Sequence, residues 1–224
     1  MRLSSFGSLR KCIVDCRKCK RLVRYRENVP PKKIHENETY WRRPVPGFGD
    51  EKGWLLITGL APAPHGGNRT GRVFTGDDSG RFLMKMLYKE GFANQPTSES
   101  ILDGLKLRGC YITAAVKCTP PLHKPTRQEL ANCNDYYINE LHLLKNVKAV
   151  LALGKFAFDA FLFSARRLGH STRGIRFSYG AKVEIDGLPT LYACYHPTPR
   201  NTNTGTLTEA MFRKLLAQIR KENI

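Results

Sequence analysis

Residues 54–77 read WLLITGLAPAPHGGNRTGRVFTGD. The run Trp54–Thr58 is short, apolar and without polar alternation, which is typical of a strand buried on both faces. The glycine-rich segment that follows, residues 59–77, is therefore a loop at the carboxyl end of this strand. Three more runs have the same character: Tyr111–Val116, Ala149–Leu153 and Thr190–Ala193.

Helical patterns separate these strands. They cover Ser79–Glu90, Thr126–Leu144, Lys155–Arg166 and Leu207–Lys221. The second helical segment opens with Thr126 and Glu129, a capping-box pair. Strands that alternate with helices form parallel sheets covered by helices on both faces. The sequence therefore predicts an α/β fold, a three-layer α/β/α sandwich, built as one domain over residues 1–224.

The first fifty residues differ from this body. Ser4–Arg26 begins like a helix and is crowded with basic residues, whereas Asn28–Asp50 is rich in proline, glycine and charge, as in a long surface loop. We therefore interpret residues 1–50 as an N-terminal extension of the domain. No segment approaches the roughly 20 apolar residues of a membrane span, and the N-terminus has no signal-peptide pattern. Neither secretion nor a membrane partner is expected.

The charge balance points to a polyanionic partner. Lysine and arginine number 37 against 19 acidic residues, which gives a net charge of +18. A positive field of this size concentrates nucleic acid, and neutralised phosphates release counterions on binding. Charge alone leaves open a merely basic protein, such as one bound to a ribosome or to an anionic membrane.

The seven cysteines have metal-ligand features. Cys16 and Cys19 form a C-x-x-C pair, and Cys118 and Cys133 lie far downstream. Four thiolates suit zinc or an iron–sulfur cluster, although a zinc ribbon would carry a second C-x-x-C. Unpaired structural thiols remain the alternative, because cysteine is often a buried hydrophobic residue.

The loop after the first strand combines several chemical groups. Its glycines permit close approach of the backbone to a ligand, but it lacks the P-loop pattern. Its side chains with functional groups are His65, Asn68, Arg69, Arg72, Phe74 and Asp77. This mixture suits stacking and edge-reading of a planar base beside a phosphate backbone. Plainer roles are a core position for Phe74, an N-cap for Asp77, loop orientation for His65 and structural ion pairs for the two arginines.

A second loop, Tyr195–Gly205, follows the last predicted strand. It places His196 directly after the strand, with Pro197 and Pro199 stiffening the backbone behind it. Ligands of open α/β sheets bind beyond the carboxyl ends of the strands, and histidine is a frequent acid, base or donor there. We therefore expect His196 to be catalytic.

These two loops carry a family resemblance. GLAPAPHGGNRTGRVFTGD, residues 59–77, resembles the first motif of the family 5 (type b) uracil-DNA glycosylases, and HPTPRNT resembles their second motif. AVKCTPP with a later cysteine resembles the cluster region shared with family 4 enzymes. The resemblance extends from Cys16 to about Asn203. It implies a central four-stranded parallel sheet and a [4Fe–4S] cluster held by Cys16, Cys19, Cys118 and Cys133.

The resemblance also implies roles for residues. Phe74 would stack on a flipped base, and His196 would donate a hydrogen bond to the base carbonyl. Backbone groups near Ala61 would contact the base edge, and Asp77 matches the carboxylate proposed to assist. The other base-binding candidates are His65, Asn68 and Ala114. The phosphate-binding candidates are Arg69, Arg72 and Arg200.

Two departures from better-known superfamily members concern base selection. Leu60 and Ala61 stand where many members have an acidic residue, and Ala114 stands where family 4 has a uracil-selecting asparagine. The resemblance therefore implies a monofunctional glycosylase that removes uracil, hypoxanthine and other damaged bases. A strict uracil enzyme of family 4 type, an iron–sulfur electron carrier and a non-catalytic metal-containing nucleic-acid-binding protein are the alternatives.

The resemblance further implies the partner and the setting. The partner is double-stranded DNA with a flipped base, and single-stranded DNA is a second candidate. A monomer in a prokaryotic cytoplasm is the expected state.

Overall fold

The computed structural model describes residues 3–224 and contains a six-stranded sheet of order β1-β3-β2-β4-β6-β5. The strands are β1 (Phe48–Gly49), β2 (Leu55–Gly59), β3 (Cys110–Ala114), β4 (Ala149–Leu153), β5 (Lys182–Val183) and β6 (Thr190–Cys194). Strands β3, β2, β4 and β6 pair in parallel, with Leu56 opposite both Tyr111 and Val150. Their carboxyl ends therefore meet at one edge of the sheet.

The four strands predicted from apolar runs are confirmed. They are buried along nearly their whole length, as expected of strands covered on both faces. The sheet is nevertheless mixed, because β1 and β5 add an antiparallel edge on each side. Each edge strand is two residues long and carries no apolar pattern, so neither could be predicted from the sequence.

Helices complete the three layers. They are α1 (Phe6–Val14), α2 (Lys20–Asn28), α3 (Gly67–Thr70), α4 (Asp78–Lys89), α5 (Arg127–Leu143), α6 (Lys155–Arg167), α7 (Pro199–Asn203) and α8 (Glu209–Asn223). The capping box predicted for the second helical segment is present at the start of α5: the Thr126 hydroxyl accepts from the Glu129 amide, and the Glu129 carboxylate accepts from the Thr126 amide.

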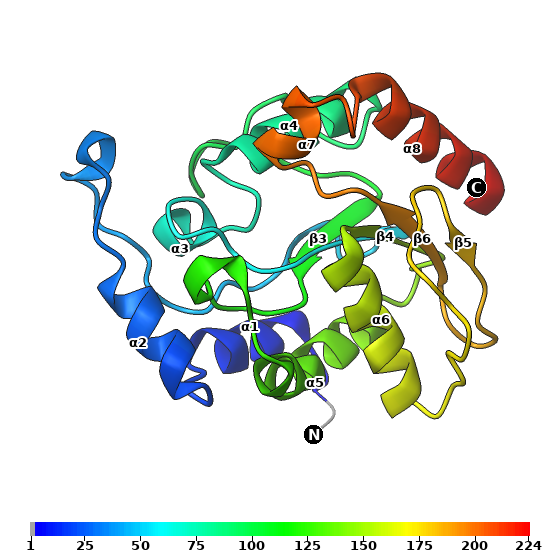
Figure 1. The fold of residues 1–224 in the computed structure, drawn as a ribbon, viewed down its shortest axis with the longest axis horizontal. Helices are drawn as coiled ribbons and strands as arrows, with labels where there is room; N and C mark the ends of the chain where they lie inside the picture. Colours follow the sequence, from blue (N-terminus) through cyan, green and yellow to red (C-terminus); the bar gives the residue numbers. More distant parts are fainter. Residues whose placement is uncertain (1–2) are drawn as a thin grey trace.

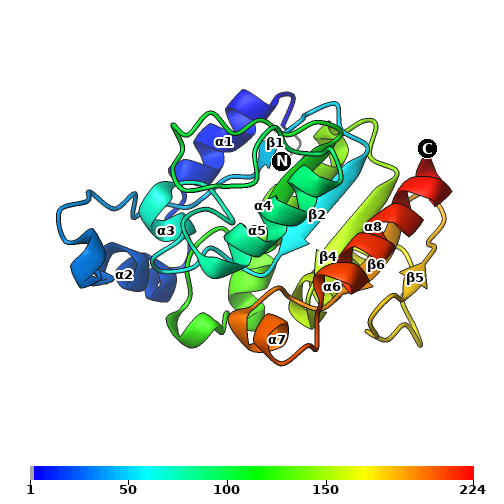
Figure 2. The ribbon, with the colours of Figure 1, turned by 90° about the horizontal axis from the view of Figure 1, so that it is seen from above.

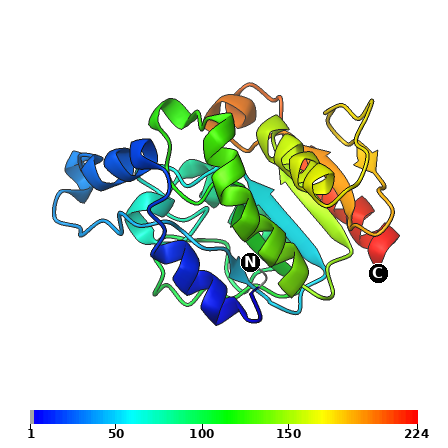
Figure 3. The same cartoon turned by 90° about the horizontal axis from the view of Figure 1, so that it is seen from below.

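Helices cover both faces of the sheet (Figure 1), and each face has its own buried core. Helices α4 and α8 lie over one face, as Figure 2 shows from above, and Leu83 and Phe212 pack there with Ile57. Helices α1, α5 and α6 lie over the other face, visible from below in Figure 3, where Tyr137 and Phe158 pack. The predicted α/β architecture with helices on both faces is confirmed.

The N-terminal segment is packed against this body. Leu9 and Ile13 of α1 form a small buried cluster with Tyr136 of α5. The segment Asn28–Asp50, predicted as loop, also contains a 3₁₀ turn at Lys33–His35 and the edge strand β1. Across residues 3–224, none of the helices has the length and apolar character that crossing a membrane requires.

Candidate active site

A pocket of about 450 Å³ lies at the carboxyl ends of the parallel strands. It is lined by Leu60, Ala61, Ala63, Val73, Phe74, Asp77, Asp78, Ser79, Ala114, His123, Leu153, Gly154, Lys155, Phe156, His196, Thr198 and Pro199. The loops after β2, β3, β4 and β6 all contribute to it. This is the place where open α/β sheets bind ligands. Five of the residues predicted from sequence meet here: Ala61, Phe74, Asp77, Ala114 and His196.

Phe74 is held in an unusual backbone conformation. Its φ of 51° lies in the left-handed region, which a bulky residue rarely adopts. Two glycines make room for it: a Cβ at Gly59 would stand 2.7 Å from the Phe74 ring, and a Cβ at Gly80 would collide with the Phe74 carbonyl. Such strain is kept where the surroundings over-determine it, commonly at ligand sites. The ring is therefore fixed in the pocket wall.

His196 lies beside this ring. The two ring centroids are 5.9 Å apart and the planes are 26° from parallel. The amide of Asn201 donates to the His196 carbonyl at 2.8 Å, and Gly154 leaves space for the His196 side chain. Burial, aided by the positive field of His123, lowers the pKa of His196 to about 4. The imidazole is therefore neutral at physiological pH, and one ring nitrogen carries a donor hydrogen.

Asp77 combines a structural contact with a position in the pocket. Its Oδ1 accepts from the Gly80 amide at 2.8 Å, so it is the N-cap of α4, as the sequence allowed. Its carboxylate packs closely on the backbone of Gly66. Burial raises the pKa of Asp77, and within residues 3–224 it forms no ion pair. A largely buried carboxylate that forms no ion pair is a feature of functional sites.

Two of the expected base contacts lie elsewhere. His65 is not part of the pocket lining, and its Nδ1 is 3.1 Å from the Tyr40 hydroxyl. Asn68 is buried outside the lining, where its Nδ2 donates to the Arg26 carbonyl at 3.1 Å. Both residues hold the glycine-rich loop to the N-terminal segment. For His65, the loop-orienting role that the sequence left open fits this geometry better than a base contact.

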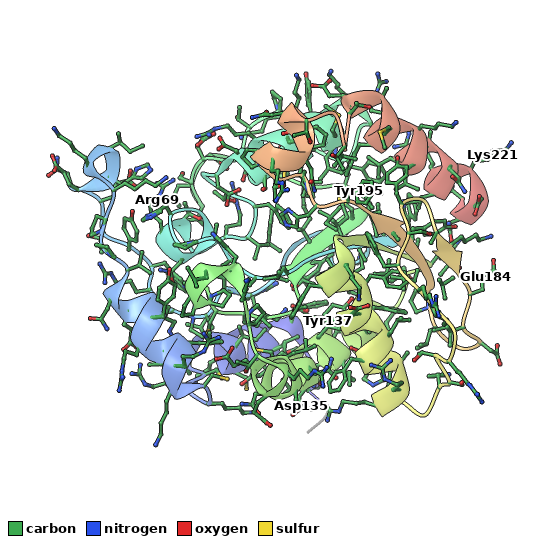
Figure 4. The ribbon with its side chains drawn as sticks, in the orientation of Figure 1. Arg69, Asp135, Tyr137, Glu184, Tyr195 and Lys221 are labelled. Atoms are coloured by element: carbon green, nitrogen blue, oxygen red, sulfur yellow. The ribbon has the colours of Figure 1, made fainter. Side chains whose placement is uncertain are left out.

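The two arginines of the same loop also point inward. Arg72 is 5% exposed, and its guanidinium binds Asp103 at 2.6 Å and Ser98 at 2.8 Å. Arg69, labelled in Figure 4 on α3, pairs with Glu38 and donates to the His65 carbonyl at 2.8 Å. These contacts favour structural ion pairs over phosphate binding. Arg200 is exposed on α7, beside the pocket.

The four cysteines named from sequence line one small cavity. Cys16 and Cys19 come from the turn before α2, Cys118 follows β3, and Cys133 is on α5. Within the described chain, no set of three acidic, histidine or cysteine side chains already stands in metal-binding geometry. The shared cavity nevertheless brings together two sequence-distant pairs of thiols.

A buried arginine faces these sulfur atoms. Arg26 is 2% exposed, its Nη1 donates to Cys118 Sγ at 3.0 Å, and its Nη atoms reach the Cys16 carbonyl at 3.2 Å. Its Nε has no hydrogen-bond partner among residues 3–224. The nearest carboxylate, that of Glu27, is 3.8 Å away. A buried guanidinium is stable only beside an anionic group. The four cysteine sulfur atoms next to Arg26 would supply that negative charge as thiolates, so these residues fit a thiolate-bound cluster.

Sequence reasoning missed two features near the site. His123 lines the pocket from the turn after β3. Lys117 and Glu140, both fully buried, form an ion pair at 2.8 Å, and Lys117 also donates to the Ala114 carbonyl in the pocket wall. A lysine at the end of an apolar run is the one sequence signal that pointed to this pair.

The structure is that of an α/β protein with a ligand-sized pocket at the carboxyl ends of its parallel strands, and the chain matches the family description "Uracil DNA glycosylase superfamily" over residues 46–220. A type-5 uracil-DNA glycosylase of Pyrobaculum aerophilum is 45% identical over 204 residues, which are 91% of this chain and 87% of the relative. One of Thermus thermophilus is 45% identical over 212 residues, 93% of this chain and 94% of the relative. A type-4 enzyme of Archaeoglobus fulgidus is 29% identical over 203 residues, 87% of this chain and 82% of the relative.

The chain thus belongs to the uracil-DNA glycosylase superfamily and, within it, to the type-5 enzymes. It is a DNA-repair hydrolase of N-glycosyl bonds, and its substrate is DNA.

Proposed function

We propose that the pocket receives a base extruded from DNA and that Phe74 and His196 bind it there. The single observation that carries this proposal is the fixed Phe74 ring next to a neutral His196 at the carboxyl edge of the sheet. An aromatic face stacks on any base, and a neutral imidazole donates one hydrogen bond without carrying a charge. Ala61 and Ala114 line the same pocket and would border the base edge.

The reaction breaks the bond between the sugar carbon and the base nitrogen. Negative charge develops on the departing base and positive charge on the sugar. A preorganised donor aimed at the base oxygen stabilises the first charge, and such a donor is worth roughly 3 kcal/mol. We assign this role to the N–H of His196. The developing anion is stabilised best by a donor that is already in place and shielded from water.

Asp77 is proposed to stabilise the sugar cation or to orient the attacking water. Its carboxylate is at the pocket and forms no ion pair among residues 3–224. In an apolar surrounding, a positive sugar is the partner that would favour its ionised form. Capping α4 with Oδ1 leaves the second carboxylate oxygen for this purpose.

The base range is proposed to include hypoxanthine as well as uracil. The walls at Leu60, Ala61 and Ala114 offer no side-chain hydrogen bond that would reject a different base edge. A panel of duplexes with uracil, hypoxanthine or a normal base, each followed by hot alkali, tests this. Excision of uracil and hypoxanthine only, with strand breakage only after alkali, is expected. Excision of uracil alone would support the strict alternative.

The four cysteines are proposed to hold a [4Fe–4S] cluster, a group that joins distant chain segments through iron–thiolate bonds and carries negative charge. Arg26 supports this, because its buried guanidinium already donates to Cys118 Sγ. The cluster would fasten α2 to the loop after β3 and to α5. Iron and sulfide analysis with visible absorbance tests this: a colourless protein that contains zinc would contradict the proposal.

We propose that DNA binds over the mouth of the pocket, at the edge of the sheet where the parallel strands end. Arg200 of α7 is exposed there and would contact a phosphate. Loss of a single phosphate contact weakens binding evenly across sequences and lowers its salt dependence. Because the substrate is DNA and the named relatives are prokaryotic, we propose a prokaryotic cytoplasmic setting.

A further inference from the structure

A buried ion pair adjoins the turn that carries Phe74. Arg72 stands two residues before Phe74, and its guanidinium donates to Asp103 Oδ2 at 2.6 Å and to Ser98 Oγ at 2.8 Å. The side chain of Arg72 is 6% exposed and that of Asp103 is 14% exposed. Neither residue is part of the pocket lining. Any effect of this pair on a bound base must therefore pass through other residues.

The guanidinium of Arg72 has further contacts that fix its plane. Its Nε donates to Thr75 Oγ1 at 2.9 Å, so Arg72 also holds the residue that follows Phe74. The guanidinium carbon lies over the ring of Phe48 of β1, 5.2 Å from the ring centroid. A planar, forked guanidinium makes these contacts together, and a lysine ammonium cannot reproduce them.

The loop that contains Asp103, residues 94–106, bonds to the same turn a second time. The Gly76 amide donates to the Ser98 carbonyl at 2.8 Å, and the hydroxyls of Thr75 and Ser98 are 2.6 Å apart. One loop thus holds the chain on both sides of Phe74. The φ of Phe74 is 51°, and a strained backbone persists only where its surroundings over-determine it. These bonds supply such surroundings.

Asp103 is held in its charged form by its own loop. Its Oδ2 accepts from the amides of Glu99 and Ser100 at 2.8 Å and 3.3 Å, and its Oδ1 accepts from the Leu105 amide at 3.0 Å. Burial opposes the charged form, but the bonds from Arg72 and from the backbone outweigh burial and lower the pKa of Asp103. The carboxylate is therefore in place to receive the guanidinium.

We propose that Arg72 and Asp103 are positioning residues for excision, which hold the Phe74 ring ready for stacking before a base enters the pocket. The inference rests on the stacking role proposed above for Phe74 and adds the residues that keep the ring in place. Without the pair, the turn would relax toward ordinary backbone angles, and the ring would have to be ordered whenever a base binds. Buried ion pairs in general add little net stability, because desolvation offsets their attraction. Contacts on both sides of a strained residue favour positioning instead.

The test uses Asp103→Asn, which keeps the size of the side chain, and Arg72→Lys, which keeps the charge. Single-turnover excision is measured on a G·U duplex. Both variants should lower the rate roughly fivefold or more, and by no more than Phe74→Ala does, because base stacking on Phe74 is all that they can remove. Arg72→Gln removes the cation and should leave the salt dependence of duplex affinity unchanged, since a buried guanidinium neutralises no phosphate.

A double-mutant cycle separates positioning from stability. In a Phe74→Ala background, Asp103→Asn should change the excision rate little, because the ring through which it acts is gone. Leu144→Ala is the control for lost stability. Its leucine is 2% exposed and ends α5 just before β4, at the amino end of the sheet and away from the pocket. This control should lower Tm and leave the excision rate unchanged at temperatures where the protein is folded.

Three results would overturn the inference. They are wild-type rates for both Asp103→Asn and Arg72→Lys, additive losses in the cycle, and a weaker salt dependence for Arg72→Gln, which a phosphate contact would produce. A fully active Phe74→Ala protein would instead sink the stacking role proposed for Phe74.

Discussion

Gly59, the last residue of β2, leaves the space that the Phe74 ring occupies. A Cβ at this position would stand 2.7 Å and 2.8 Å from two carbons of the ring. Carbon atoms in contact are roughly 3.5–4.0 Å apart, so the ring or the strand would have to shift by about 1 Å. The strand is paired with β3 and β4, whereas the ring borders the pocket. Gly59→Ala is therefore expected to displace Phe74.

The expected magnitude follows from the role of the ring. Stacking on an aromatic side chain is worth roughly 1–3 kcal/mol per base, which corresponds to a fivefold to 150-fold change in rate. Gly59→Ala should lower kcat/KM on a G·U duplex by an amount in this range, and overpacking should cost roughly 1–3 kcal/mol of stability. Phe74→Ala should lower kcat/KM similarly, without the overpacking.

A double-mutant cycle tests the reasoning. If Gly59→Ala acts by displacing the ring, it should change kcat/KM little in a Phe74→Ala background, and the stability loss should shrink there. Excision kinetics and thermal unfolding are measured for all four proteins. Gly7→Ala is the control, since the nearest atom to its Cβ would be 3.9 Å away. Strictly additive effects, or a fully active Gly59→Ala protein, would refute the argument.

Three further perturbations test other parts of the site. Burial raises the pKa of Asp77 above the ordinary aspartate value of about 3.9. When the pH is lowered, Asp77 therefore becomes protonated at a higher pH than an ordinary aspartate does. The wild-type excision rate should show this acidic limb and Asp77→Asn should lack it; identical profiles would exclude the role. Glu140→Gln leaves Lys117 buried without its partner, which should cost roughly 3–5 kcal/mol and lower Tm by about 10 °C; an unchanged melting curve would count against this. Cys133→Ser should reduce iron content and visible absorbance, and full iron retention would remove Cys133 from the ligand set.

The core of the fold was predictable because buried segments have a recognisable pattern of apolar residues. The run Trp54–Thr58 and its three counterparts gave the parallel strands, since strands buried on both faces are continuously apolar. Caps were predictable for a similar reason: Thr126 and Asp77 satisfy helix amides through short-range contacts. The edge strands could not be foreseen, because two half-exposed residues have no pattern of their own.

The site was predictable only in part. Phe74, Asp77 and His196 stand out by type and by their place after strands, and the structure brings them into one pocket. Arg72 looked equally suited to phosphate, but its partner Asp103 lies 31 residues away, and only the fold brings the two together. The turn that exposes Leu122 depends on left-handed backbone angles, which no local signal predicted for a leucine.

The central claim is that His196 acts on the departing base and not in holding DNA. The most direct measurement is single-turnover excision of uracil from a G·U duplex by His196→Ala, with the affinity for the same duplex measured in parallel. Removal of one preorganised donor should lower the rate roughly 10²- to 10³-fold and leave the affinity close to wild type. An equal loss of rate and affinity, or an excision rate that does not change, would contradict the account.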